Sequence, residues 1–537
     1  MTRRRGAGMI AVLLFVAACT AGGETETSPP PTTETAPPTT VIEDGCPDVF
    51  CVTYRIRPEA KWSDGTPVSA DDFVFTYNRV MAREDHPGGY DLITEVNPLD
   101  ALTLRLAFSE VYPPFRTLFP VVVAAHGEGS VTSGPFILEF VGAEEVVLRR
   151  NPSYWSEADP VSGMALGDVE TLRFVDPGGL RSSLAGLRRG EVDLIVPEPR
   201  DWALAELAGL DGVSLEVVPG PVWEHIDLQQ EDALLSNPWV RRAFALAIDR
   251  EAVADATVRS LDPSAPLLGN TVWMTKSSRY EDHYPVSYDP QAAEGILREN
   301  GCVRGEDGVF VCGEARMSFR WAAADGDPLR RAVFEEVSAQ LRKVGIEVVA
   351  EFRLPSELYA SDFLFGGVEA WQIINFAWQA SADPRDANSI YRCGGSLNVN
   401  RYCNREVDAL IDRAESTVDP DERASLYNQA DALYLADLTV IPLFQRPVAV
   451  AWRSDLAGPE PNISRSTLLW NVGSWSGVEE VVIGLDAVPT LEDVLFPTSA
   501  GDAMVASALY LGAFSVGPSF DYLPVLIESV EISGGEE

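Results

Sequence analysis

The sequence predicts an α/β protein of the mixed α+β kind, and two observations lead to that class. Hydrophobic residues occupy 46% of the 537 positions, which is enough apolar material for a large core and a length typical of two to four domains. Stretches with apolar residues at helical spacing alternate along the chain with short runs of β-forming residues. Such alternation is typical of proteins in which helices pack against sheets.

Two helices have clear beginnings in the sequence. Ser69 followed by Asp72 is a capping-box pattern in front of an apolar helical face. Asn237 followed by Pro238 begins the second helix, because proline suits a first helical turn. Further helices are expected at residues 290–299, 329–344, 404–416 and 420–436, and strands at residues 145–148, 192–196, 347–352 and 440–444.

The first residues have the layout of a secretory signal, assigned to residues 1–18. Three consecutive arginines precede an apolar run that is too short to cross a bilayer and ends at Cys19. The stretch VAAC resembles a bacterial lipobox, which implies that Cys19 begins the mature chain and carries lipid. A plain signal with an incidental cysteine is the alternative. Residues 19–40, rich in Thr, Pro, Glu and Gly, predict a disordered linker.

Six further cysteines fall into three close pairs. Thiols of exported proteins normally oxidise, and pairing between neighbours is the simplest connectivity. The second pair encloses turn residues followed by β-formers, which predicts a bridged hairpin. Zinc is the competing interpretation, but the chain has only four histidines and none is spaced as a ligand partner of these cysteines. The predicted disulfides join Cys46 to Cys51, Cys302 to Cys312 and Cys393 to Cys403.

Charge and motif content exclude several classes of function. A formal net charge of −40 repels phosphate backbones, so no nucleic-acid partner is expected. The chain lacks the Gly-x-x-x-x-Gly-Lys-Ser/Thr loop of ATPases and the His-Glu-x-x-His pair of zinc proteases. Trp475 occupies the nucleophile position of the only stretch, GSWSG, that resembles a hydrolase elbow. We therefore expect a protein that is not an enzyme, with no catalytic residue, metal or cofactor.

A series of sequence blocks resembles family 5 of the bacterial extracellular solute-binding proteins, which are the oligopeptide, dipeptide and nickel receptors of ABC importers. The blocks follow the family order over most of the chain, so together they are far more specific than any one alone. They are WSDGTPVSADDFVFTYNRVM (62–81), TSGPFILEF with RRNPSYW (132–155), LRRGEVDLIV (187–196), NPWVRRAFALAIDREAV (237–253), YDPQAAEGILRENG (288–301), LRKVGIEV (341–348), YCNREVDALIDRA (402–414) and DPDERASLYNQADALYLADLTVIPLF (419–444).

The resemblance implies a two-lobed clamshell of the periplasmic-binding-protein kind, type II, in the large peptide-binding subclass. Lobe I would comprise residues 41–228 and 446–537, and lobe II residues 229–445. The implied protein is a monomeric lipoprotein, anchored through Cys19 outside the cell membrane, that closes on a peptide or similar small ligand. It would deliver this ligand to the permease and ATPase subunits of an ABC importer. A ligand-sensing lipoprotein and an exported hydrolase are the alternatives.

The resemblance also suggests where a ligand binds. In peptide-binding relatives an acidic residue shortly after a tryptophan captures the ligand's amino terminus, but here Ser381 stands where that acid is expected. Trp378 is the first candidate for the cleft, with a core tryptophan as the alternative. Asp383 faces a ligand or caps the turn before the next proline. Trp223 and His225 precede the expected hinge, with a core tryptophan and a surface histidine as alternatives.

Asn398 and Arg392 are further candidates, because both lie near the third cysteine pair. They meet a ligand or are merely solvated in a loop.

The carboxyl-terminal residues carry blocks that the family has at its amino terminus. The usual opening blocks are missing ahead of Trp62, whereas residues 481–497, 504–514 and 522–533 resemble them. This implies a circular permutation in which residues 478–537 complete lobe I and place Tyr510 near the cleft. Residues 478–486 would then lie beside residues 192–196, and residues 525–532 near residues 52–57. A truncated second copy, forming a tail with exposed apolar residues, is the alternative.

Overall fold

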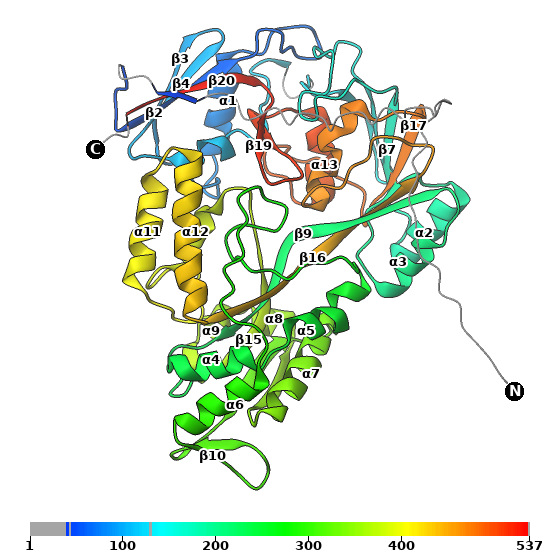
Figure 1. Cartoon of the computed structure of the whole chain (residues 1–537). Coiled ribbons are helices and arrows are strands. Elements are labelled where there is room, and N and C mark those ends of the chain that lie inside the picture. The colour runs from blue at the N-terminus through cyan, green and yellow to red at the C-terminus, as the bar shows by residue number, and fades with distance from the viewer. Residues whose placement is uncertain (1–38, 42–44, 128–130, 535–537) are drawn as a thin grey trace, which may run out of the picture. The chain divides into compact units, whose positions relative to one another are not determined.

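Two long antiparallel strands, β9 (Val213–Leu228) and β16 (Val440–Arg453), run through the fold and join the parts on either side of them (Figure 1). The computed structural model describes residues 39–41, 45–127 and 131–534. Elements formed by residues before β9 and after β16 lie towards one end of the two strands, and those formed by the residues between lie towards the other.

The ladder between β9 and β16 is irregular at its centre. Its register shifts beside Pro442 and Pro447 of β16. Proline donates no hydrogen bond to a ladder, and the resulting β-bulges bend and twist the strand. The two strands are therefore least regular where the chain passes from one part of the fold to the other.

Both strands belong to one mixed sheet of ten strands. In pairing order these are β14 (Glu347–Arg353), β13 (Ser318–Ala324), β15 (Ile373–Gln379), β9, β16, β8 (Leu194–Ile195), β17 (Glu480–Gly484), β7 (Thr171–Val175), β6 (Glu145–Arg150) and β5 (Phe136–Val141). Some neighbours, such as β13 and β14, are parallel, and others, such as β5 and β6, are antiparallel.

Smaller sheets complete the β structure. A five-stranded sheet has the order β1 (Thr39–Val41), β20 (Ile527–Gly534), β2 (Phe50–Ile56), β4 (Thr103–Phe108) and β3 (Ile93–Asp100). The remaining strands form a three-stranded sheet and a hairpin, namely β10 (Cys302–Arg304), β11 (Phe310–Cys312) and β12 (Ala315–Arg316), and β18 (Phe514–Val516) with β19 (Tyr522–Pro524).

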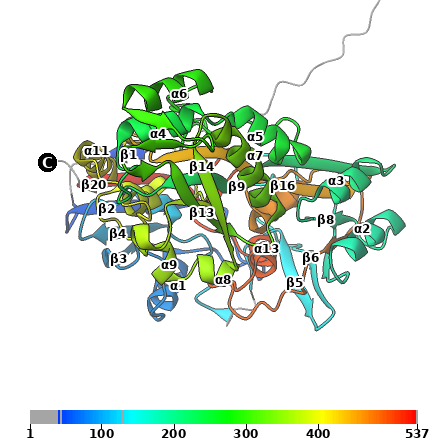
Figure 2. The same ribbon diagram turned by 90° about the horizontal axis from the view of Figure 1, so that it is seen from below.

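Helices cover the faces of the sheets, and Figure 2 shows α7 and α8 on opposite sides of β13 and β14. The α-helices are α1 (Ala70–Met81), α2 (Leu180–Arg189), α3 (Asp201–Ala208), α4 (Pro238–Leu246), α5 (Arg250–Ala256), α6 (Pro290–Glu299), α7 (Pro328–Lys343), α8 (Pro355–Leu358), α9 (Ser361–Leu364), α10 (Ala387–Tyr391), α11 (Arg405–Ser416), α12 (Pro420–Ala436) and α13 (Ala500–Leu509). Short 3-10 helices are η1 (Pro113–Thr117), η3 (Val258–Ser260), η4 (Gly367–Glu369), η5 (Pro384–Asp386) and η6 (Arg465–Ser474).

The predicted helices are confirmed, and their beginnings follow the predicted caps. Ser69 and Asp72 form the capping box of α1, and α4 begins at Pro238 after Asn237. The observed α6 and α12 have the predicted bounds, and α7 and α11 differ from theirs by one residue. The strand predicted at residues 440–444 continues to Arg453, because β9 pairs with it over that length.

Buried apolar side chains gather in separate clusters on the two sides of β9 and β16. The largest cluster draws its fully buried members from residues 50–196 and 450–532, and Trp62 and Trp475 are among them. A second lies within residues 226–444 and contains Phe244 and Trp321. A third packs α11 and α12 together.

The carboxyl-terminal segment is built into both large sheets. β17 lies between β7 and β8, with Ile483 opposite Leu194, and β20 lies against β2. Both placements confirm the strand neighbours predicted for residues 478–486 and 525–532. Val481 and Ile483 are fully buried, so the alternative of a tail with exposed apolar residues is wrong.

All three predicted disulfides are present, joining Cys46 to Cys51, Cys302 to Cys312 and Cys393 to Cys403. The second closes the hairpin of β10 and β11, as the turn residues between its cysteines predicted.

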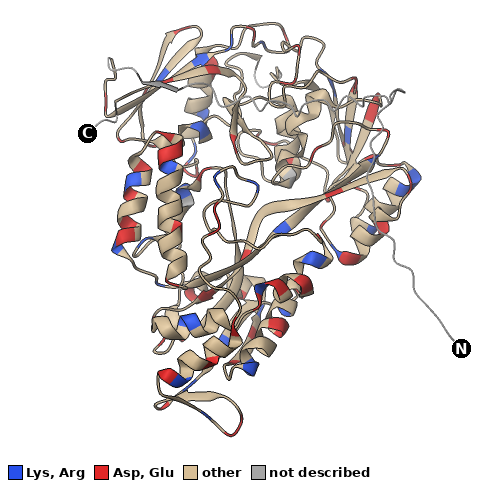
Figure 3. Cartoon of the chain, viewed as in Figure 1, with Lys and Arg blue, Asp and Glu red and all other residues tan. Residues whose placement is uncertain are grey.

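The predicted signal and Cys19, the predicted lipidation site, lie outside the described residues, as does almost all of the linker predicted at residues 19–40. Within the part of the chain that the structure describes, no helix combines the length and apolar character needed to cross a membrane. Acidic and basic residues are interspersed along helices such as α6 and α11 (Figure 3).

Candidate ligand-binding site

Three of the predicted binding residues lie together on one face of the ten-stranded sheet. Trp223 of β9 stands opposite Trp378 of β15, and His225 stands opposite Phe376. Residues two apart in a strand point to the same side, so these four rings meet. The ring centre of His225 is 4.5 Å from that of Trp223 and 4.4 Å from that of Phe376, and Trp378 stacks on His225 at 6.3 Å.

Two small cavities lie against this aromatic face. The inner cavity is lined by Trp223, His225, Asp227 and Trp378, together with residues of α10, α12 and residues 397–400. The outer cavity shares the two tryptophans and adds Ser381. Their volumes are about 10 Å³ and about 30 Å³, so each admits roughly one water-sized group.

Apolar residues from the parts of the fold on both sides of β9 and β16 meet beside the cavities. Trp223 packs in one buried cluster with Met274, which lies between β9 and β16 in the sequence. Ile463 and Phe520, from the carboxyl-terminal part, belong to the same cluster. Phe520 lies in the segment whose sequence implies a permutation, so that segment forms part of the surroundings of the cavities.

Polar contacts join the same two parts of the chain. Arg279 forms an ion pair of 2.9 Å with Asp521, which lies between β18 and β19. Arg385 donates a hydrogen bond of 2.9 Å to the hydroxyl of Tyr112 and another of 3.3 Å to the carbonyl of Gly88. Movement of one part away from the other would break these contacts.

Ser381 and Asp383 are both engaged by the protein. The Ser381 hydroxyl donates to the backbone carbonyl of Asp383. Asp383 accepts from the backbone N–H of Arg385, which is the turn-capping role considered from the sequence. Its oxygens also accept from Arg423 at 2.8 and 3.1 Å.

A second carboxyl group lies beside this pair. Glu415 is 3.4 Å from Arg423 and accepts a hydrogen bond from the Tyr427 hydroxyl. Burial raises the pKa of Glu415 to about 7, with Arg423 opposing the rise and Asp383 adding to it. The charge of this carboxyl group therefore changes near neutral pH.

The other predicted residues lie outside both cavities. The Asn398 amide donates to the carbonyls of Arg392 and Tyr402 at 2.7 Å and thereby orders the loop of the third disulfide. Arg392 forms an ion pair of 2.7 Å with Asp412. Tyr510 is buried in the largest apolar cluster, where burial raises the pKa of its hydroxyl.

Several residues of the inner cavity were not among those predicted from the sequence. Asp227 could have been found from the alternation of side chains along β9, because Asp227 points to the same side as Trp223 and His225. Residues from α10, α12 and the 397–400 loop reach the cavity only through tertiary packing, and they are Tyr391, Asn400 and Tyr434.

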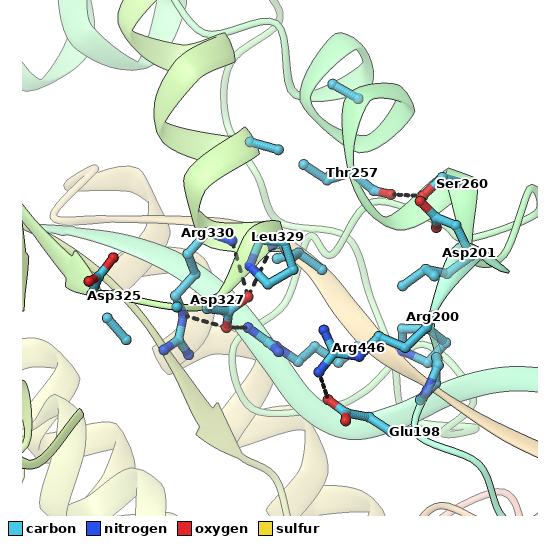
Figure 4. A pocket seen from close by; sticks show the side chains of 18 of the residues that line it. Glu198, Arg200, Asp201, Thr257, Ser260, Asp325, Asp327, Leu329, Arg330 and Arg446 are labelled. Carbon is cyan, nitrogen blue, oxygen red and sulfur yellow. Dashed lines mark hydrogen bonds and ion pairs between the residues drawn. The ribbon is translucent and has the colours of Figure 1, made fainter. Parts of the chain in front are cut away.

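A larger, charged pocket of about 540 Å³ is lined by Arg330 and Arg446, among other residues (Figure 4). Both arginines bind Glu224 of β9, whose side chain points away from the aromatic face and is fully buried, 3.0 Å from Arg330 and 2.6 Å from Arg446. Burial raises the pKa of Glu224, but the two guanidinium groups outweigh burial, so that its pKa lies below the ordinary value. Asp327, at the start of α7, also binds Arg446, at 2.5 Å.

Charges around this pocket are paired within the protein. Arg200 binds Glu198 at 2.8 Å, and Asp325 binds Arg331 at 2.9 Å. Among the described charged residues that line the pocket, all but Asp201 form ion pairs within the protein, and Asp201 accepts a hydrogen bond from Ser260, so we take the aromatic cavities as the candidate site. Across the described residues, no cluster of three or more His, Cys, Asp or Glu side chains is placed to hold a metal ion.

Several known proteins are similar to this chain over most of its length. The oligopeptide-binding protein OppA of Mycobacterium tuberculosis H37Rv is 26% identical over 442 residues, which cover 76% of this chain and 71% of OppA. The probable deoxycholate-binding periplasmic protein YgiS of Escherichia coli K12 is 25% identical over 441 residues, which cover 74% of this chain and 77% of YgiS.

A solved structure has the same fold. The oligopeptide-binding protein AppA of Bacillus subtilis, in complex with a nonapeptide, superposes with a TM-score of 0.55 at 21% identity, covering 82% of this chain and 89% of AppA. The family model described as bacterial extracellular solute-binding proteins, family 5 middle, matches residues 47–400. That span contains β9, β15 and the aromatic face, and it shows that the chain belongs to family 5 of the bacterial extracellular solute-binding proteins.

Proposed function

We propose that this protein is the lipid-anchored receptor of an ABC importer and that it encloses a small ligand, with a peptide as the first candidate. One observation carries the proposal. Trp223, His225 and Trp378, chosen from the sequence as cleft residues, line adjoining cavities where two separately packed parts of the chain meet. Ligand-binding sites commonly occupy such junctions.

The two parts correspond to the proposed lobes, residues 41–228 with 446–537 and residues 229–445. Separate apolar clusters on the two sides of β9 and β16 support this division. The irregular ladder beside Pro442 and Pro447 is a suitable hinge, because bulged strands tolerate bending. Closure would be favoured by a ligand that touches both lobes only in the closed form.

The names of the relatives leave the ligand open between a peptide and another small organic molecule. OppA is named for oligopeptides and YgiS for deoxycholate. A peptide remains our first candidate, because the sequence blocks resemble those of peptide receptors. We assign no catalytic role to any residue.

The anchor is a separate part of the proposal. Lipidation at Cys19 would hold the receptor at the outer face of the membrane, beside its permease and ATPase. Labelled palmitate should be incorporated into the wild-type protein in cells and not into the Cys19→Ala variant.

Binding is tested by thermal unfolding of the mature protein with mixtures of random tripeptides to pentapeptides. A peptide at a hundred times its dissociation constant should add about 2.7 kcal/mol of stability. The shift should be lost in Trp378→Ala and kept in Trp202→Ala, because Trp202 is 41% exposed and lies on α3, outside both cavities. Equal shifts in the two variants would contradict the assigned site.

Two further measurements separate the alternatives. Cells that lack the gene should lose uptake of the bound peptide if the protein serves import, and retain it if the protein only senses. Mass spectrometry of peptides incubated with the protein should find no cleavage; cleavage products would support the hydrolase alternative.

A further inference from the structure

The floor of the inner cavity carries polar atoms with unused hydrogen-bonding capacity. His225 is fully buried, and Asp227 is 2% exposed. The Nε2 atom of His225 lies 3.1 Å from Oδ2 of Asp227. Yet neither ring nitrogen, nor that oxygen, makes a hydrogen bond of normal geometry to any described residue. Burying such groups without partners costs about 1–3 kcal/mol each, so a polar group that enters the cavity would recover that energy.

The Asp227 carboxylate is held in position from its other side. Its Oδ1 atom accepts a hydrogen bond of 2.8 Å from the Asn400 side chain. Asn400 in turn lies 3.4 Å from the hydroxyl of Tyr434 and from the carbonyl of Thr439. Oδ2 is therefore the oxygen that remains for a ligand, and it lines the cavity together with His225.

Aromatic rings surround this carboxylate. Trp223, Trp378, Tyr391 and Tyr434 line the inner cavity with His225, and the ring centres of the two tyrosines are 4.4 Å apart. The faces of aromatic rings attract cations, most strongly in places that water does not reach. A carboxylate within such walls selects a positive group over a neutral one.

The charged groups around the inner cavity are negative, like the Asp227 carboxylate. No lysine or arginine occurs among the described residues that line either cavity. Burial raises the pKa of the Tyr391 hydroxyl, and the negative charges of Asp431 and Asp227 raise it further. Arg330 and Arg446 bind Glu224 on the other face of the sheet.

Size narrows the class of cation. The inner cavity, at about 10 Å³, admits one group as large as a water molecule. An ammonium group meets that limit, whereas a guanidinium or a quaternary ammonium group is several times larger. The adjoining outer cavity, of about 30 Å³ and lined by the same two tryptophans, lies beside the space for the ammonium group.

We propose that the inner cavity binds a primary ammonium group of the ligand, which donates hydrogen bonds to Oδ2 of Asp227 and to a ring nitrogen of His225. The carbon atom that carries the ammonium group faces the outer cavity, beside Trp223 and Trp378. This inference rests on the proposed function and narrows its ligand to an amine-bearing solute. A peptide amino terminus and a lysine side chain share this chemistry.

Calorimetric titration of the mature protein with matched peptides tests the proposal and separates the two sources. The peptides are N-acetyl-Ala-Lys-Ala-amide, with a side-chain amine only, Ala-norleucine-Ala-amide, with a terminal amine only, and N-acetyl-Ala-norleucine-Ala-amide, with neither. At least one amine-bearing peptide should bind about 10-fold to 100-fold more tightly than the peptide without an amine, as expected for hydrogen bonds to a charged group.

Variants test the carboxylate itself. Asp227→Asn keeps the shape and should reduce the affinity of the amine-bearing peptide to that of the amine-free one, while the amine-free peptide keeps its affinity. Asp159→Asn is the matched control, because Asp159 is also a buried carboxylate, 3% exposed, whose side chain accepts backbone hydrogen bonds away from both cavities. It should leave all three affinities unchanged.

Comparison of the peptides on the wild-type protein remains decisive if Asp227→Asn does not fold. Equal affinity for all three peptides would overturn the ammonium subsite and leave the receptor function standing. Native mass spectrometry covers the case in which none of the three binds. If an amine-free molecule then remains bound through purification, the ammonium subsite is wrong but the receptor function stands. If no molecule is bound, the receptor function is contradicted as well.

Discussion

Trp223, Glu224 and His225 show how one strand serves two different surfaces. Successive side chains of β9 alternate between its faces. The tryptophan and the histidine therefore line the aromatic cavities, whereas the glutamate points to the other face of the sheet and binds Arg330 and Arg446. This network of ion pairs between Glu224, Arg330 and Arg446 stabilises β9 and β16 on the face of the sheet opposite the candidate site.

Replacing Glu224 should therefore affect stability strongly. Glu224→Gln leaves buried Arg330 with only the more distant Asp327, at 3.8 Å, as a charge partner, and removing one member of a buried ion pair costs about 3–5 kcal/mol. Urea unfolding of the mature protein should show this loss. Glu206→Gln, in the exposed pair that Glu206 forms with Arg188, should change stability by less than about 0.5 kcal/mol. Equal effects of the two substitutions would contradict the role given to the network.

Glu415 predicts a pH dependence of stability. Its pKa is raised from the ordinary 4.5 to about 7 in the folded chain, chiefly by burial. The folded state therefore binds the proton more tightly than the unfolded state, so stability falls as pH rises from about 4.5 to 7, by roughly 2–3 kcal/mol.

The substitution Glu415→Gln mimics the protonated form and should remove this decline. Urea unfolding should find the variant more stable than wild type at pH 8 and equal to it at pH 4.5. Parallel pH profiles of the two proteins would show that another group is responsible.

At the scale of elements, the helices could be predicted almost to their ends because their signals are local. Caps such as Asp419 and the first-turn prolines of α4, α6 and α12 act within one turn. The length of β16 could not be predicted in the same way. It reaches Arg453 because β9, which lies more than two hundred positions earlier in the chain, pairs with it over that length. Pairing between distant segments leaves no local signal.

The candidate site could be predicted only in part from the sequence. Trp223, His225 and Trp378 were chosen through the family resemblance, and β9 and β15 bring them together. Asn400 and Tyr434 reach the inner cavity from a loop and a helix that the tertiary fold places there. Ser381 and Asp383, chosen from the same stretch as Trp378, are engaged by hydrogen bonds and an ion pair within the protein.

The disulfides are local braces. Each closes a short loop, so the double variant Cys302→Ser with Cys312→Ser should lose no more than about 3 kcal/mol of unfolding free energy. Circular dichroism should show a native spectrum for it. Thiol titration of the denatured, unreduced wild-type protein should find the six paired cysteines oxidised, and peptide mapping should find each bridge within its own pair. A bridge between different pairs would contradict the observed connectivity.

At the scale of the whole molecule, the carboxyl-terminal segment is an integral part of both large sheets. Deleting residues 476–537 removes β17 from between β7 and β8 and exposes apolar neighbours such as Leu194. The deleted protein should fail to unfold cooperatively. A rearranged chain with residues 478–537 placed ahead of residue 45 should restore folding, because the strands regain the same neighbours. Cooperative folding of the deleted chain would contradict the proposed permutation.

Capture of a small ligand between two lobes is the central claim, and native mass spectrometry of the gently purified mature protein tests it most directly. We expect a bound small molecule that is released on denaturation, is absent from Trp378→Ala and is retained by Trp202→Ala. Wild-type protein that carries no such molecule, and that gains no thermal stability from any of the random peptides, would contradict the claim.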